Sequence, residues 1–211
     1  MISRAALLAG AAVPLLYFGS QLAAAPLYPG YDFVRQVASE LGAPGSRAPG
    51  GFNTGAILTG LATLLVAYGY ARALPEVAHA PRGVVWLVVV ALAAAGLAGI
   101  QAGVFPLPHP RHNPRWLGAG LFVMPLLLLL AIARMPGSGA LRAYLVLSLV
   151  LLVAQFPLRA GLLGLEERTS MGLFQRLMAL AVFVPIGVVA FFLFRRMGSA
   201  VSRGADGVNI R

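Results

Sequence analysis

Residues 83–116 read GVVWLVVVALAAAGLAGIQAGVFPLPHPRHNPRW, a long apolar run followed by a proline-rich segment. No charged side chain occurs between Gly83 and Val104. An apolar run of about 20 residues is long enough for a helix to cross a bilayer. The segment that follows carries four prolines and two of the three histidines of the chain, His109 and His112. The stretch therefore predicts a membrane helix that ends in a stiff, titratable connector.

The whole composition agrees with this interpretation. Apolar residues make up 59% of the 211 residues, charged residues only 10%, and the mean hydropathy is +0.85. A soluble domain carries about 25% charged residues, and one of this size could not bury so much apolar surface. We therefore expect an integral protein of the inner (plasma) membrane of a cell, with membrane lipids as its partners.

Several kinds of chemistry are excluded by composition. The chain has no cysteine and all its basic side chains are arginine, which removes thiolate sites and lysine Schiff-base cofactors. No histidine lies inside an apolar run, so we expect no haem held across the bilayer. The arginines are scattered singly rather than clustered, which argues against a nucleic-acid partner.

Six apolar runs predict an all-α, polytopic fold, a single six-transmembrane-helix bundle over residues 1–211. Nine arginines flank the spans on the side of the termini and seven on the other side, so the positive-inside rule predicts cytoplasmic termini. The predicted spans are about 5–25, 52–71, 83–104, 116–133, 140–158 and 177–194.

The first outward loop, residues 26–51, is long for a membrane hairpin. Phe33, Val34, Val37 and Leu41 recur at helical spacing, and Gly42 follows them. This pattern predicts a short interfacial helix that lies over the bundle.

Polar residues gather near the outward ends of five spans. Such groups are costly in a bilayer and usually face the bundle interior or a water-filled cavity, although a position at headgroup depth is the alternative. A shared outward-facing polar cavity is therefore predicted. The residues concerned are Ser20, Gln21, Asn53, Gln101, Gln155, Gln175 and Arg176.

Four short motifs, YDFVRQVASELGAPGS, FNTGAILTG, GVFPLPHPRHNP and GLFQR, resemble the DUF998 family of small bacterial and archaeal membrane proteins. The family histidine could be His109 or His112, and the acidic residue expected after Pro106 is missing here. The resemblance implies about six spans with the motifs on the outward side, and it implies no activity. The matching residues are Ser39, Glu40, Leu41, Gly42, Phe52, Asn53, Gly103, Phe105, Pro106, Gly172, Gln175 and Arg176.

The candidate pocket residues are Asp32, Ser39, Glu40, Asn53, Gln101, His109, Arg111, His112, Gln175 and Arg176. Glu40 with His109 or His112 could act as an acid–base pair. The two histidines could also contribute to a zinc site, although Pro110 prevents a regular helix that would hold them together. The structural alternative is that Glu40 pairs with Arg176 or Arg111 and docks the loop.

Three functions stay open at this point. The first is an outward pocket that binds a lipid or small amphiphile. The second is a membrane-embedded lipid hydrolase or transferase that uses Glu40 and His109 or His112, with or without a metal. The third is an accessory subunit of a larger membrane-protein complex.

Overall fold

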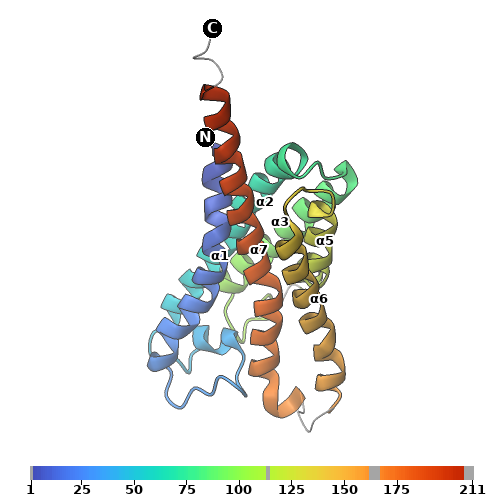
Figure 1. The fold of residues 1–211 in the computed structure, drawn as a ribbon. Coiled ribbons are helices and arrows are strands. Elements are labelled where there is room, and N and C mark those ends of the chain that lie inside the picture. The colour runs from blue at the N-terminus through green and yellow to red at the C-terminus, as the bar shows by residue number, and fades with distance from the viewer. Residues whose placement is uncertain (1, 113–114, 162–166, 207–211) are drawn as a thin grey trace.

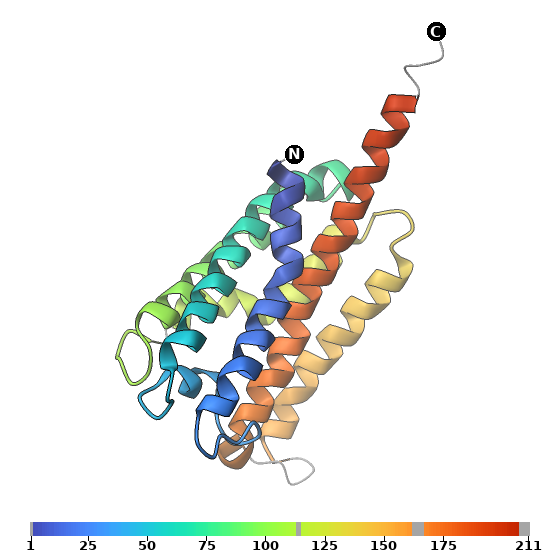
Figure 2. The same cartoon turned by 90° about the vertical axis from the view of Figure 1, so that its left-hand side faces the viewer.

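The computed structural model describes residues 2–112, 115–161 and 167–206, and all of the regular structure in these ranges is helical (Figure 1). The long helices are α1 (Ile2–Ala24), α2 (Pro49–Val77), α3 (Arg82–Val104), α6 (Gly139–Arg159) and α7 (Glu167–Asp206). Helix α7 lies between α1 and α6 and is interrupted once, at Ser170, whose backbone is not helical (Figure 2).

Within the described ranges, five segments are long and apolar enough to cross a membrane, which identifies an integral membrane protein. They are Ile2–Leu27, Pro49–Val77, Arg82–Val104, Gly139–Arg159 and Thr169–Gly198. Helix α1 begins and α7 ends at one end of the bundle, here called the terminal end (Figure 1). The opposite end, here called the loop end, carries residues 25–48 and 105–112.

The fourth predicted span takes a different form. The chain returns from the loop end to the terminal end through α4 (Arg115–Gly118), the 3-10 helix η3 (Ala119–Val123) and α5 (Met124–Ile132). The apolar stretch Trp116–Ile132 is shorter than the other five segments. The 3-10 helix η3 interrupts the run, and α5 begins again at Met124 with Pro125 in its first turn, a position where proline is tolerated. The predicted bundle of six full-length helices is not confirmed.

Two apolar cores hold the described part of the chain together. The larger lies toward the terminal end and joins α1, α2, α3, α5, α6 and α7, with Leu74, Leu92 and Ile186 fully buried. At its centre the Tyr70 hydroxyl donates a hydrogen bond of 2.6 Å to the Ile186 carbonyl. The smaller core at the loop end consists of Ala24, Ala38, Leu41 and Phe52.

Helices α2 and α3 approach each other closely at small residues. A Cβ atom on Gly96 would lie 2.8 Å from the Gly60 carbonyl oxygen, and one on Gly103 would lie 2.6 Å from the Asn53 carbonyl oxygen. Close approach through glycine is how membrane helices gain van der Waals contact, because lipid supplies no hydrophobic force between them.

The predicted interfacial helix of the first loop is not confirmed either. Residues 33–36 form turns, and only Ala38–Gly42 form a helical element, the 3-10 helix η2. Asp32 explains the turns, because its carboxylate accepts hydrogen bonds from the N–H groups of Val34 (2.8 Å) and Arg35 (3.2 Å). Leu41 is fully buried as expected, whereas Phe33 and Val34 are exposed.

Candidate functional site

Arg176 at the start of the span in α7 fastens the first loop to the bundle. One guanidinium nitrogen, Nη1, donates to the carbonyls of Phe33 (2.7 Å), Gln36 (3.0 Å) and Gly172 (2.9 Å). The other, Nη2, donates to the Tyr31 hydroxyl. The same guanidinium lies 4.8 Å from the centre of the Phe33 ring. A single cation thus binds two carbonyls of the loop, those of Phe33 and Gln36, and ties them to α7.

Three further contacts hold the loop over the helix ends. The Gln175 side-chain oxygen accepts a 2.7 Å hydrogen bond from the N–H of Ala38, and the Asn53 amide donates to the Gly42 carbonyl at 3.1 Å. Gly172 lies under the carbonyls of Phe33 and Gln36, where a side chain would collide with the loop backbone. The loop is therefore fitted to α2 and α7 and is not free in solvent.

Glu40 does not form the ion pair that was considered for it. Its carboxylate accepts hydrogen bonds from the Val37 N–H (3.0 Å) and the Gln36 side-chain amide (2.8 Å), both within the loop. Among the described residues no ion pair joins Glu40 to Arg176 or to Arg111. The carboxylate thus organises the turn that presents carbonyls to Arg176.

The connector after α3, residues 105–112, also covers the loop end of the bundle. This connector and the first loop, residues 25–48, are here called the two caps. The Gln101 side chain donates to the Arg111 carbonyl at 2.8 Å, and the His112 N–H donates to the His109 carbonyl at 2.9 Å. His109 is exposed and its ring packs at 4.8 Å on Phe105. His112 instead turns inward, and its Nδ1 lies 2.9 Å from the Phe105 carbonyl oxygen.

A cavity of about 120 Å³ lies beneath the two caps, between α1, α2, α3 and α7. Its walls are mostly apolar or small, with Tyr17, Phe52, Gly60, Ala102 and Phe183 among them. Ser39, His112 and Gln175 line its loop end, and Thr59 and Thr63 line it deeper along α2. The threonine hydroxyls are occupied by the carbonyls one turn earlier, Gly55 and Thr59, at 2.8 Å each.

The three polar side chains at the loop end have hydrogen-bonding capacity left. A carbonyl can only accept, so His112 donates through Nδ1, and in the neutral form of the ring this tautomer leaves an acceptor lone pair on Nε2. Gln175 uses its oxygen on Ala38, which leaves the amide N–H groups as donors. The Ser39 hydroxyl can donate or accept. This set matches a hydroxyl or carbonyl group.

Two titratable groups of the first loop, Tyr31 and Asp32, have pKa values shifted from their usual ones. Burial raises the pKa of the Tyr31 hydroxyl above 10.0, and the nearby Arg176 guanidinium opposes this shift without cancelling it. The N–H groups of Val34 and Arg35 lower the pKa of the Asp32 carboxyl. The loop therefore holds a neutral Tyr31 and an ionised Asp32 at neutral pH.

The cavity brings together three of the predicted pocket residues, Ser39, His112 and Gln175. The other seven do not line it: Glu40, Asn53 and Arg176 hold the first loop, Gln101 and Arg111 hold the second cap, Asp32 forms a turn and His109 faces outward. Within the described ranges no group of three or more His, Asp or Glu side chains could share a metal ion.

A model of the family described as a protein of unknown function (DUF998) matches residues 11–192. The chain belongs to the DUF998 family. No match was found for it among curated proteins or among solved structures. Residues from all four stretches that carry the sequence resemblance contribute to the two caps or to the contacts beneath them, as Leu41, Asn53, Phe105 and Arg176 illustrate.

Sequence reasoning on this DUF998 chain missed Tyr31, Gln36 and the deeper wall of the cavity. Tyr31 contacts Arg176, and its hydroxyl donates to the Val37 carbonyl at 3.0 Å. Thr59 and Thr63 stand four residues apart in an otherwise apolar span, with Gly60 beside them. Because residues four apart lie on the same face of a helix, this spacing could have predicted that both threonines line the inner face of α2.

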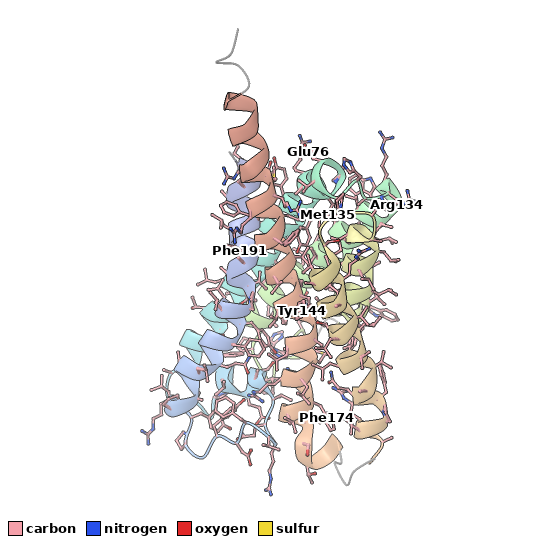
Figure 3. All side chains as sticks on the ribbon, in the orientation of Figure 1. Glu76, Arg134, Met135, Tyr144, Phe174 and Phe191 are labelled. Atoms are coloured by element: carbon pink, nitrogen blue, oxygen red, sulfur yellow. The ribbon has the colours of Figure 1, made fainter. Side chains whose placement is uncertain are left out.

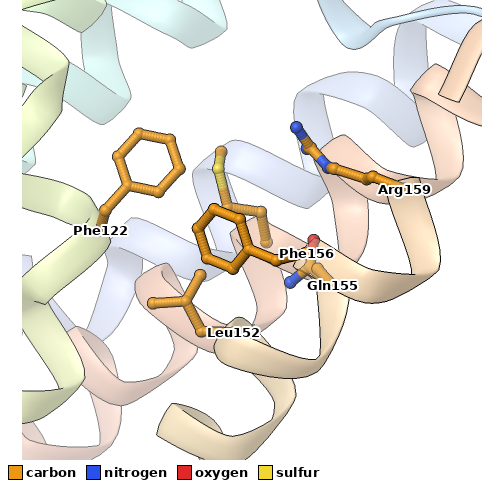
Figure 4. A pocket seen from close by; sticks show the side chains of 6 residues that line it. Phe122, Leu152, Gln155, Phe156 and Arg159 are labelled. Carbon is orange, nitrogen blue, oxygen red and sulfur yellow. The ribbon is translucent and has the colours of Figure 1, made fainter.

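A second pocket at the loop end is much smaller. It encloses about 30 Å³ between η3, α6 and α7, beside Phe122, Gln155, Phe156 and Arg159 (Figure 4). This is roughly the volume that one water molecule occupies in the liquid. The larger cavity beneath the caps is therefore the candidate site of this DUF998 protein.

Proposed function

We propose that this protein binds a small amphiphile, or the polar end of a lipid, in the cavity beneath the two caps. The observation that carries the proposal is the distribution of polarity in that cavity. Hydrogen-bonding groups of Ser39, His112 and Gln175 stand at the loop end, and the rest of the wall is largely apolar. Sites for small ligands usually combine an apolar lining with a few placed polar groups.

The size of the cavity limits the ligand. An engineered cavity of about 150 Å³ in another protein takes up benzene, so the 120 Å³ here suits a body of about that size. A complete two-chain lipid does not fit, but one polar end does. The preferred ligand carries a neutral hydroxyl or ester carbonyl, since no carboxylate and no guanidinium of the described residues lines the cavity.

Binding of 4-fluorophenol to the purified protein in detergent, followed by ¹⁹F NMR, tests this proposal. We expect a saturable bound signal for 4-fluorophenol and a weaker one for fluorobenzene, which lacks the hydroxyl. Ala102→Phe fills the cavity and should abolish the signal. Ala23→Phe is the matched control, because Ala23 is exposed on the outer face of α1.

Equal binding in both variants would place the probe in the micelle and refute the proposed site. A Ser39→Ala variant separates the polar contribution from the apolar one, because Gln175 also holds the first loop through the Ala38 N–H. Losing one hydrogen bond to a neutral group should weaken binding by about 1 kcal/mol, or about fivefold.

A further inference from the structure

A third cavity, of about 220 Å³, lies at the terminal end of the bundle, far from the caps. On one side it is lined by His79 in the α2–α3 connector and by Val84 in the first turn of α3. On the other side it is lined by the end of α5, including Leu130, and by Arg134. The proposed amphiphile site uses none of these residues.

The chemistry of this cavity divides into a rim and a floor. Arg134 and His79 are exposed side chains on the rim, and Figure 3 shows Arg134 at the terminal end, at the edge of the bundle. Ala131 is buried in the floor, whereas Leu130 is 46% exposed. The cavity thus has a polar rim at the terminal end and an exposed apolar side chain at its mouth.

Among the side chains that the structure describes, no acidic one lines the cavity to neutralise its rim. The acidic side chain described nearby, Glu76, already forms an ion pair of 3.5 Å with Arg72. A guanidinium has a fork of N–H donors that matches a phosphate group, and an imidazole can add one more donor. The rim therefore complements an anion that carries several oxygens.

The connector that carries His79 is fixed rather than loose. The N–H groups of Ala78 and Ala80 both donate to the Leu74 carbonyl, at 3.2 and 3.1 Å. His79 between them has a φ of 52°, a left-handed conformation that is uncommon outside glycine. These two hydrogen bonds hold the backbone in that conformation, so the position of His79 on the rim is set by the fold.

We propose that this cavity binds the phosphate group of an anionic membrane phospholipid from the leaflet at the terminal end. Arg134 and His79 contact the phosphate oxygens, and the upper part of one acyl chain lies against Val84 and Leu130. The apolar floor and the exposed apolar side chain at the mouth favour a lipid over a free anion. The net charge of +10 adds a general attraction to anionic bilayers.

Native mass spectrometry of the full chain tests this site, with the protein released from nanodiscs of equimolar phosphatidylglycerol and phosphatidylcholine with identical chains. We expect preferential retention of phosphatidylglycerol, reduced about fivefold by Arg134→Gln, since one basic residue near a membrane surface contributes about that factor. His79→Leu should lower retention in the same direction. Arg72→Gln is the matched control, as it removes a charge at the same end outside the cavity.

Equal losses in Arg134→Gln and Arg72→Gln would overturn the proposal, because surface charge alone would then explain retention. Displacement of phosphatidylglycerol by millimolar inorganic phosphate would also overturn it in favour of a free-anion site. If Arg134→Gln does not fold, Ala133→Phe keeps every charge and narrows the mouth. It should reduce retention to the same extent, and unchanged retention in this variant would contradict the proposed site.

Discussion

At the residue scale, Arg176 does most to close the loop end. Its guanidinium reaches three backbone carbonyls and the Tyr31 hydroxyl, and its Nε is buried without a hydrogen-bond partner. Lysine carries the same charge but only one nitrogen, so it cannot reproduce this fork. The loop thus depends on the shape of the arginine side chain as well as on its charge.

We expect Arg176→Gln to destabilise the detergent-solubilised protein by about 3 kcal/mol, since a hydrogen bond to a charged group contributes about 1.5–3 kcal/mol. Arg176→Lys should recover only part of this. Thermal unfolding and amide exchange at residues 33–38 measure the effect. Arg35→Gln is the control: its ion pair with Asp32 is 3.6 Å long and exposed, so it should change stability by less than about 1 kcal/mol. Unaltered exchange in Arg176→Gln would show that the loop is held by other contacts.

Sequence reasoning identified Arg176 and Glu40, and one of its alternatives paired Glu40 with Arg176 or Arg111. Charge counting can pair a cation with a carboxylate, yet it cannot show that backbone carbonyls compete for the same cation. Here the carbonyls of Phe33 and Gln36 occupy Arg176, and Glu40 is occupied by the Val37 N–H. Which of the two histidines faces the cavity was likewise undecided in the sequence. The connector backbone, through the carbonyl of Phe105, makes it His112.

At the element scale, the walls of the cavity depend on the contact between α2 and α3. Gly60 and Gly99 both line the cavity, and Gly96 touches the Gly60 carbonyl one turn deeper. The close approach therefore sets the width of the cavity as well as the packing of the two helices.

Gly96→Ala should destabilise the protein by about 1–3 kcal/mol, because the new methyl group forces α2 and α3 apart and overpacking of this kind costs that much. Gly19→Ala provides the comparison, since Gly19 lies in α1 with no atom within 4 Å of an added Cβ. There the substitution should be neutral or stabilising by up to about 1 kcal/mol. Chemical unfolding of both variants measures the difference, and equal behaviour would argue against a tight α2–α3 contact.

The elements themselves were predictable to different degrees. Uninterrupted apolar length locates α1, α2, α3, α6 and α7, because backbone groups inside a bilayer must bond within a helix. Length also located the apolar run at residues 116–133, but it could not show that α4, η3 and α5 divide that run. Periodicity failed in residues 32–42, where the Asp32 carboxylate bonds nearby N–H groups that a helix would have used. Local side-chain competition of this kind is not visible in a hydrophobic pattern.

At the scale of the whole molecule, we propose that the terminal end faces the cytoplasm and that the chain crosses the bilayer six times, with α4, η3 and α5 as the irregular crossing. The chain contains no cysteine, so single introduced cysteines report topology directly. Cysteines at Arg47 and Arg111 should react with an impermeant reagent added outside intact cells, and a cysteine at Glu76 should not. Labelling of the cysteines at positions 47 and 111 from opposite sides of the membrane would contradict this topology, because two crossings, α2 and α3, must return the chain to the same side.

Fluorescence quenching can show whether the two caps enclose an amphiphile site. With Trp86 and Trp116 replaced by phenylalanine, Phe183→Trp places one reporter in the cavity wall and Leu180→Trp places one on the lipid-exposed face of the same helix. On addition of 4-bromophenol to the reconstituted protein, we predict saturable quenching at position 183 that Ala102→Phe removes, and non-saturating quenching at position 180. Identical, non-saturating curves at both positions would contradict an enclosed site.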